Sequence, residues 1–186
     1  MQHSCVHRKQ LMYISLILII CSSSLFVSAV NPAIALFQQG EKRLQTGEIF
    51  GAIDLFKESL SYNPDYVKPL YGLSRAYFKL EEYEQALIYV QRAKQLDRNN
   101  TQIAALEGRI HTGLGQFEQA KRIFDTILNR EPYNLDAQFG IAELHAAMGN
   151  IENAVSRYRK ALESDPYNRR GLLSAALLYA AQDNSE

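Results

Sequence analysis

Residues 67–100 read VKPLYGLSRAYFKLEEYEQALIYVQRAKQLDRNN, and residues 101–134 read TQIAALEGRIHTGLGQFEQAKRIFDTILNREPYN, with turn-forming residues at the same places in both. Such marks recur every 34 residues: Asn63-Pro64, Arg98-Asn99-Asn100, Pro132-Tyr133-Asn134 and Pro166-Tyr167-Asn168. Counted from these marks, the chain divides without a gap into residues 33–66, 67–100, 101–134 and 135–168 and a half repeat, 169–186. Self-similarity at a fixed period of this length predicts a stack of equivalent structural units.

Small and large residues also keep fixed places within the repeat. The eighth place is small throughout: Gly40, Ser74, Gly108, Ala142 and Ala176. The twentieth place is alanine: Ala52, Ala86, Ala120 and Ala154. The twenty-fourth place is large: Phe56, Val90, Phe124 and Tyr158. Small residues let two helices approach closely, so these places predict where the helices of a repeat meet. Period and pattern together resemble the tetratricopeptide repeat family over residues 33–186.

The resemblance implies an all-α fold, an α-solenoid in which antiparallel helix pairs form a right-handed superhelix of four repeats plus a C-terminal helix. Glycine fills the turn inside three repeats, where a positive φ is cheap only for glycine: Gly47, Gly115 and Gly149. Glu81 stands at the same place in the second repeat, and we expect it to lower local stability. Asparagine is placed to cap the first helix of most units: Asn31, Asn100, Asn134 and Asn168.

The resemblance also implies a concave groove lined by the first helix of each repeat. The residues that match the family's groove places and form the candidate partner site are Phe37, Lys68, Tyr71, Arg75, Phe78, Lys79, Arg109 and Phe139. Tyr71 and Phe78 lie two helical turns apart with Arg75 between them, which suits a peptide with an apolar anchor and an acidic group. The alternative interpretation is that the aromatic residues are ordinary for the family and the basic ones are simply solvated.

Some family members clamp a terminal carboxylate of a chaperone with lysine, asparagine and arginine. The matching places here are occupied by Phe37, Glu41, Gly72, Gln102 and Leu106. That clamp is absent, so the C-terminal tails of chaperones are not the expected ligand.

The last segment is rich in leucine and is not followed by a second helix. Its apolar residues are Leu172, Leu173, Leu177, Leu178 and Tyr179. A terminal helix of a repeat array usually presents a polar outer face. The four leucines therefore form a candidate association surface, for a partner or for a second copy of the chain. A structural subunit that oligomerises through this helix is the alternative function.

The N-terminal residues 1–29 are predicted to be a signal peptide or a membrane anchor. Arg8 and Lys9 precede an apolar stretch, LMYISLILII at residues 11–20, and Val27 and Ala29 suit cleavage after Ala29. Residues 11–30 carry no charge and are long enough to span a bilayer if they are retained. Lipidation at Cys21 is a third interpretation, although Ile20 departs from that pattern. Each interpretation places the repeats outside the cytosol, in a periplasm or a secretory lumen.

The composition removes several classes of function. The chain has 20 basic and 20 acidic residues, whereas a nucleic-acid surface needs a basic excess. Both cysteines, Cys5 and Cys21, precede the repeats, so no thiolate site or disulfide is expected in the fold. His111 and His145 share the eleventh place of their repeats and are expected to pack rather than to bind metal. We therefore expect no catalytic, metal or cofactor site. The expected function is that of a non-enzymatic scaffold for a protein or peptide partner, and assembly of an envelope complex is one role it could serve.

Overall fold

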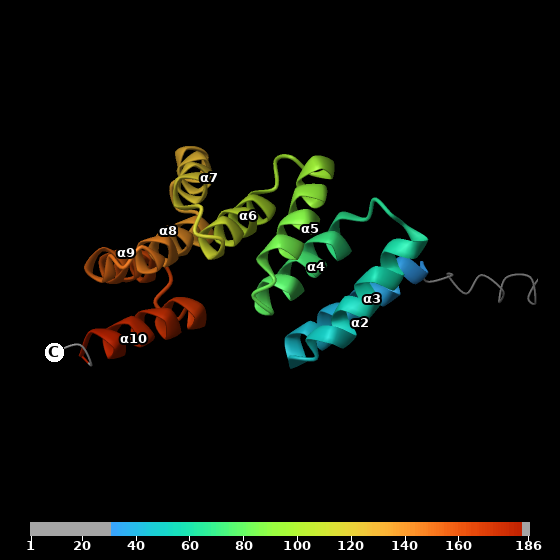
Figure 1. Cartoon of the computed structure of the whole chain (residues 1–186), viewed down its shortest axis with the longest axis horizontal. Helices are drawn as coiled ribbons and strands as arrows, with labels where there is room; N and C mark the ends of the chain where they lie inside the picture. Colours follow the sequence, from blue (N-terminus) through green and yellow to red (C-terminus); the bar gives the residue numbers. More distant parts are fainter. Residues whose placement is uncertain (1–30, 184–186) are drawn as a thin grey trace, which may run out of the picture.

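Residues 31–183 are described by the computed structural model, in which they form helices and no strand. The bounds of the helices are Pro32–Thr46 (α2), Ile49–Tyr62 (α3), Val67–Lys79 (α4), Tyr83–Leu96 (α5), Thr101–Gly113 (α6), Phe117–Arg130 (α7), Leu135–Ala147 (α8), Ile151–Ser164 (α9) and Arg169–Asp183 (α10). Consecutive helices pair as α2 with α3, α4 with α5, α6 with α7 and α8 with α9, and α10 packs on α9 (Figure 1). The all-α solenoid predicted from the repeats is confirmed.

The turn inside each repeat has a left-handed backbone, as the glycines predict. Gly47, Gly115 and Gly149 have φ values of 86°, 71° and 76°. Glu81 takes the same conformation, with φ of 60°, at the place where the other repeats have glycine. Left-handed backbone is unfavourable for a residue with a side chain, which gives a physical reason for the lower stability expected in the second repeat; the loss of stability itself stays a prediction.

Asparagine caps the first helix in four of the units. The side-chain oxygen of Asn31 accepts a hydrogen bond from the backbone N–H of Ala33, and that of Asn100 accepts from two N–H groups at the start of α6. Asn134 and Asn168 cap α8 and α10 in the same way. These bonds satisfy backbone donors that have no partner within the helix.

The core consists of large rings packed against glycine. Phe56 is fully buried, and a Cβ on Gly72 would lie 2.7 Å from its ring. Phe124 is also fully buried, and a Cβ on Gly108 would lie 2.7 Å from its ring. Gly72 therefore lets α4 approach the ring of the preceding repeat without a clash, and Gly108 lets α6 approach the ring of its own repeat.

The last helix departs from the repeat pattern. At its eighth place Ala176 is exposed, whereas Ala175 is buried beside Phe139 and Tyr158. The prediction that Ala176 provides the small contact is wrong: within residues 31–183 α10 packs on α9, and Ala175 makes that contact. The described helices include none long and apolar enough to cross a membrane. The predicted leader, residues 1–29, lies outside the described residues.

Candidate functional site

Four of the predicted groove residues line one pocket formed by α2, α4 and α6. Phe37 comes from α2, and Lys68, Tyr71 and Arg75 come from α4. The pocket has a volume of about 270 Å³, and its remaining lining residues are Glu41, Val67, Asn100, Gln102 and Ile103. Because the pocket is made by the first helices of three successive units, it requires the stacked array and cannot exist in a single repeat.

Inside this pocket Arg75 already has an acidic partner from the same chain. Its Nη1 donates to Glu41 Oε1 at 3.0 Å and to Glu41 Oε2 at 2.9 Å. The guanidinium carbon lies 5.6 Å from the centre of the Tyr71 ring, within the range of a cation–π contact. Burial raises the pKa of Tyr71, so its hydroxyl stays protonated and able to donate a hydrogen bond.

Phe78 and Arg109 lie in a different pocket, one repeat further along. The guanidinium carbon of Arg109 lies 4.5 Å from the centre of the Phe78 ring, and both line a pocket of about 400 Å³ that Tyr83 and Phe117 also line. Arg109 donates from Nε to Glu143 Oε2 at 2.7 Å and from Nη2 to Oε1 at 3.4 Å. The aromatic and basic patch predicted from the sequence is therefore divided between two pockets.

The two ion pairs follow the repeat. Glu41, Arg75, Arg109 and Glu143 all stand at the ninth place, so each arginine meets a carboxylate 34 residues away. The sequence predicted Arg75 and Arg109 as groove residues, but we did not foresee that each pairs with a carboxylate of an adjacent repeat. The signal was present, because opposite charges at one place of adjacent repeats face each other when the repeats stack. Neither interpretation of the basic residues, as ligands of an acidic group or as simply solvated side chains, included these ion pairs.

Two predicted groove residues behave differently from the rest. Phe139 is 2% exposed and packs against Tyr158, with ring centres 6.0 Å apart, so its ring is almost entirely covered. It does line a separate pocket with Gln102 and Asp136, and its contact with a partner stays a prediction. Gly171 of α10 explains the burial, since a Cβ there would lie 2.5 Å from the Phe139 ring. Lys79 is exposed at the end of α4 and lines neither of the two pockets.

The candidate association surface on α10 is largely open. Leu172, Leu173 and Leu177 are 46%, 63% and 63% exposed. Leu178 instead packs against the buried cluster that contains Phe139 and Ala175. Three of the four leucines are thus available to a partner, and Leu178 belongs to the core.

The two histidines at the eleventh place lie in different surroundings. His111 is buried, and its Nδ1 lies 2.6 Å from Gln116 Oε1. Burial, followed by Arg157 and Lys121, lowers the pKa of His145, which favours a neutral ring. Among residues 31–183 no cluster of three histidine, cysteine or acidic side chains is arranged to hold a metal ion.

Comparison with known proteins agrees with this architecture. The tetratricopeptide repeat family model matches residues 43–110 and 111–169. Human RNA polymerase II-associated protein 3 is 28% identical over 107 residues, which make up 56% of this chain and 16% of that protein. The CTR9 homolog of Arabidopsis thaliana is 31% identical over 109 residues, 57% of this chain and 10% of that protein. The chain thus matches less than a fifth of the length of either relative.

Solved structures show the same fold. A thermophilic TPR protein of Thermus thermophilus superimposes with a TM-score of 0.69 at 22% identity, over 82% of this chain and 84% of that one. YrrB, described as a TPR protein with an unusual peptide-binding site, gives 0.58 at 19% identity, over 88% and 84% of the chains. The first TPR domain of Spaghetti, solved with an HSP90 peptide, gives 0.58 at 24% identity, over 63% and 94%.

Proposed function

The chain belongs to the tetratricopeptide repeat family, and from that premise we propose that it holds a peptide segment of a partner protein in the pocket lined by Tyr71 and Arg75. The fold is that of a non-enzymatic interaction scaffold. Phe37 and Tyr71 offer apolar and aromatic surface to an anchoring side chain, and exposed Lys68 offers a positive charge at the edge. The observation that carries the proposal is that these side chains, from two helices, converge on one pocket of about 270 Å³.

The ligand's acidic group is expected at Arg75 rather than at Arg109. Both bonds from Arg75 to Glu41 start from Nη1, which leaves Nε and Nη2 without a partner among the described residues. Arg109 uses Nε and Nη2 together, the edge that binds a carboxylate most effectively. Arg75 therefore has the freer guanidinium edge.

The ligand should differ from the HSP90 peptide bound to Spaghetti. Glu41 stands at one of the places that match a carboxylate clamp, and its carboxylate is aligned with Arg75. A second negative group at that point would be repelled by Glu41. An internal segment with one acidic side chain fits this pocket better than a free C-terminus.

Site-specific crosslinking tests the proposal in cells that express the full chain. A photoreactive amino acid at Lys68, at the pocket edge, should give a discrete crosslinked product that Tyr71→Ala weakens. The matched control carries the same amino acid at Gln91, which is exposed on α5 and does not line the pocket. Crosslinks that form equally from both positions, or that form only near Leu173 and Leu177, would refute a groove ligand.

We propose that the chain binds its partner outside the cytosol, in a periplasm or a secretory lumen. Assembly of an envelope complex is a role that fits this location. The support is the sequence of residues 1–29, with its basic start, apolar core and small residues near Ala29. N-terminal sequencing of the protein from a membrane or secreted fraction tests this. Recovery of the intact chain in the cytosol would contradict it.

Self-association through α10 is the second candidate function. The exposed side chains of Leu172, Leu173 and Leu177 favour it, because a contiguous apolar face is rarely left open on a monomer. Sedimentation of the full chain, compared with Leu173→Glu/Leu177→Glu, decides the matter. A monomer at high concentration for the unchanged chain would refute self-association.

A further inference from the structure

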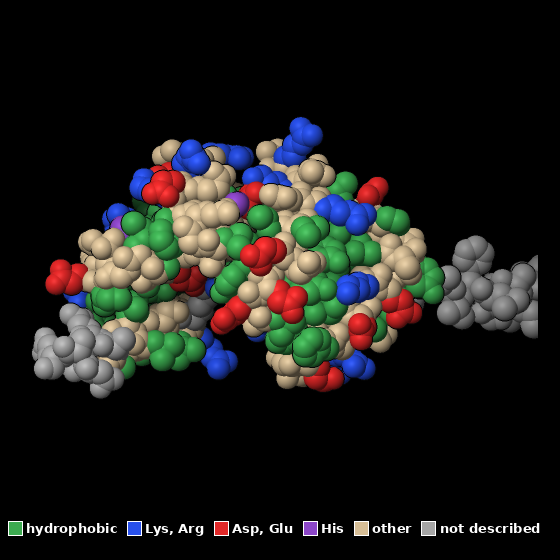
Figure 2. All heavy atoms as spheres, in the orientation of Figure 1, with side chains coloured by type: hydrophobic (Ala, Val, Ile, Leu, Met, Phe, Trp, Pro, Cys, Tyr) green, Lys and Arg blue, Asp and Glu red, His purple; other side chains and the backbone are tan. Residues whose placement is uncertain are grey.

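A third pocket lies between the second helices α5 and α7, at the N-terminus of α6. Ala104, Ile123 and Ile127 give it apolar surface, and its volume is about 280 Å³. Its basic lining residues are Lys94, Arg98, Arg122 and Arg130. Figure 2 shows Lys and Arg side chains gathered along the upper edge of the molecule, over α7 and the C-terminal end of α5.

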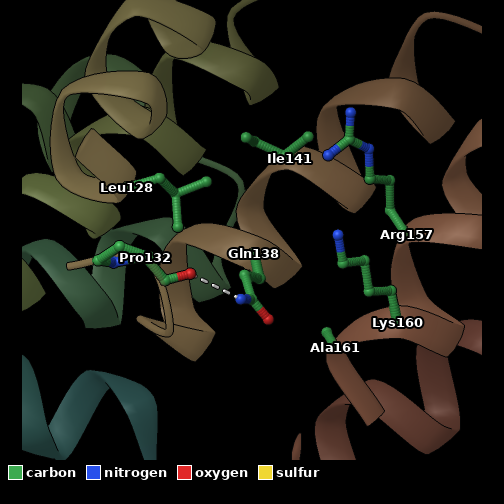
Figure 3. A pocket seen from close by; sticks show the side chains of 7 residues that line it. All are labelled: Leu128, Pro132, Gln138, Ile141, Arg157, Lys160 and Ala161. Carbon is green, nitrogen blue, oxygen red and sulfur yellow. Dashed lines mark hydrogen bonds between the residues drawn. The ribbon is translucent and has the colours of Figure 1, made fainter. Parts of the chain in front are cut away.

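A fourth pocket, of about 120 Å³, repeats this position one unit later, between α7, α8 and α9 (Figure 3). The two linings are related by the repeat: Lys94, Arg98, Ala104, Ile123, Thr126 and Ile127 become Leu128, Pro132, Gln138, Arg157, Lys160 and Ala161. The basic residues have changed places, yet each pocket retains apolar lining and cations. The chain therefore carries two register-matched basic pockets, which we call the back pockets.

The cations of the back pockets mostly lack acidic partners. Arg98, Arg130, Arg157 and Lys160 form no ion pair with any residue between 31 and 183. Arg122 donates to the neutral amide oxygen of Gln119. A cluster of like charges without counter-charge is unfavourable, and an anionic ligand would relieve it.

Two nearby carboxylates are paired with lysine, whereas Asp97 and Glu131 accept from the neutral amides of Asn100 and Asn134. Glu107 accepts from Lys94 at 2.5 Å, and Asp125 accepts from Lys121 at 2.7 Å. The pKa of His145 is lowered first by burial and then by the positive charges of Arg157 and Lys121. The charged residues that line the back pockets are all cations, although the whole chain is neutral.

Gln138 adds a hydrogen-bond acceptor to the fourth pocket. Its Nε2 donates to the backbone oxygen of Pro132 at 3.0 Å, which fixes the amide. Its Oε1 is buried and accepts no hydrogen bond from the described residues. A buried acceptor of this kind is stabilised by a donor, and the backbone N–H of a bound peptide is a suitable one.

We propose that the back pockets form a second protein-binding surface, which takes an extended acidic segment with an aliphatic side chain seated against Ile123 and Ile127. Carboxylates of the segment bind Arg98, Arg122 and Arg157, and a backbone N–H binds Gln138 Oε1. The surface uses other binding groups than the groove, because α5, the turn after it, α7 and α9 supply its cations whereas α2 and α4 supply the anchor residues of the groove pocket; Asn100 lines both. One scaffold can then hold two partners at once.

A peptide fits these observations better than an anionic membrane. A layer of lipid headgroups meets side chains that protrude from a surface, whereas these cations surround apolar recesses between helices. Arginine forks also match single carboxylates in a fixed geometry. The 34-residue spacing of the two pockets further suits a linear segment that runs along the array.

Fluorescence anisotropy with the full chain tests the proposal. The probe is a labelled dodecapeptide of repeated Glu-Glu-Leu units. The control peptide has lysine in place of glutamate. We expect the acidic probe alone to bind, and Arg122→Gln/Arg157→Gln to weaken it at least about tenfold, since two charge-assisted bonds are lost. Lys121→Gln lies on the same helix as Arg122 but outside both pockets. It should change the affinity less than about twofold, because interactions between exposed charges are weakened by solvent and salt.

Unchanged binding by the double variant would overturn the proposal, and so would an equal loss with Lys121→Gln. Loss of this binding in Tyr71→Ala would place the probe in the groove and would also overturn it. The proposal would also fail if the acidic probe does not bind while phosphatidylglycerol vesicles bind through Arg122 and Arg157. That result would assign the surface to a membrane. Circular dichroism of each variant keeps unfolding from being mistaken for lost binding.

Discussion

Arg75 holds both carboxylate oxygens of Glu41, 34 residues earlier in the chain, through the single nitrogen Nη1 at 3.0 and 2.9 Å. The contact links α2 to α4 across the floor of the groove pocket. It neutralises part of the charge on the arginine and aligns its guanidinium over Tyr71. Any acidic ligand of this pocket must share Arg75 with Glu41.

Removing the charge of Glu41 should therefore strengthen binding of an acidic groove peptide. We expect Glu41→Gln to raise the affinity by up to about fivefold, as measured by anisotropy with a labelled peptide of phenylalanine, leucine and one glutamate, because a charge pair is worth about 0.2–1 kcal/mol at partial exposure. The free energy of unfolding should change by less than about 1 kcal/mol. Glu58→Gln, the same change on exposed α3 surface, serves as the control. Equal affinities for both variants would argue against competition by Glu41.

Adding one methyl group at Gly140 should destabilise the array. A Cβ there would run into the ring of Phe124, which is fully buried and cannot move aside. We expect Gly140→Ala to lower the free energy of unfolding in urea by about 1–3 kcal/mol, the usual cost of overpacking. Gly51→Ala is the matched control, because its Cβ would meet only the end of the Arg43 side chain. That variant should gain about 0.5–1 kcal/mol from helix propensity.

Glycine at position 81 should stabilise the second repeat. Glu81 has a φ of 60°, and the left-handed region costs a residue with a side chain about 1–2 kcal/mol. Glycine removes that cost but loses about 0.5–1 kcal/mol in backbone entropy. Glu81→Gly should thus gain up to about 1 kcal/mol and raise the midpoint of thermal unfolding. Neighbouring Glu82 has a φ of −80°, so Glu82→Gly should lower the midpoint. A lower midpoint for both variants would contradict strain at Glu81.

The stability of the fold should fall in mild acid through His145. Burial, with Arg157 and Lys121, holds the pKa of this residue below the usual 6.5. Below that pH the unfolded chain takes up a proton that the folded chain resists, so the free energy of unfolding declines as the pH falls from 6.5 toward the folded pKa. Above 6.5 the contribution is complete. Urea denaturation between pH 5 and pH 8 should show a flatter profile for His145→Gln, and an identical slope in both proteins would exclude this residue.

The local features of the fold could be predicted because they depend on one helix or one turn. Asn100 caps the helix that directly follows it, and Gly115 turns the chain where it stands. Burial of Phe124 follows from its place in a periodic pattern. The burial of Phe139 could not be predicted, because it depends on Gly171 of α10, which makes room for the ring. That contact joins residues 32 positions apart.

The sequence by itself determined the repeat length, the helix pairs, the turns, the caps and the family, since each is recorded as a spacing along the chain. The tertiary structure alone decided that Arg75 meets Glu41 and that Arg109 meets Glu143, and it divided the aromatic patch between two pockets. It also brought cations of α5, α7 and α9 to two pockets at matching positions of successive repeats. The physical reason is that such contacts depend on how far each helix is rotated against its neighbours, and the side-chain packing between repeats sets that rotation.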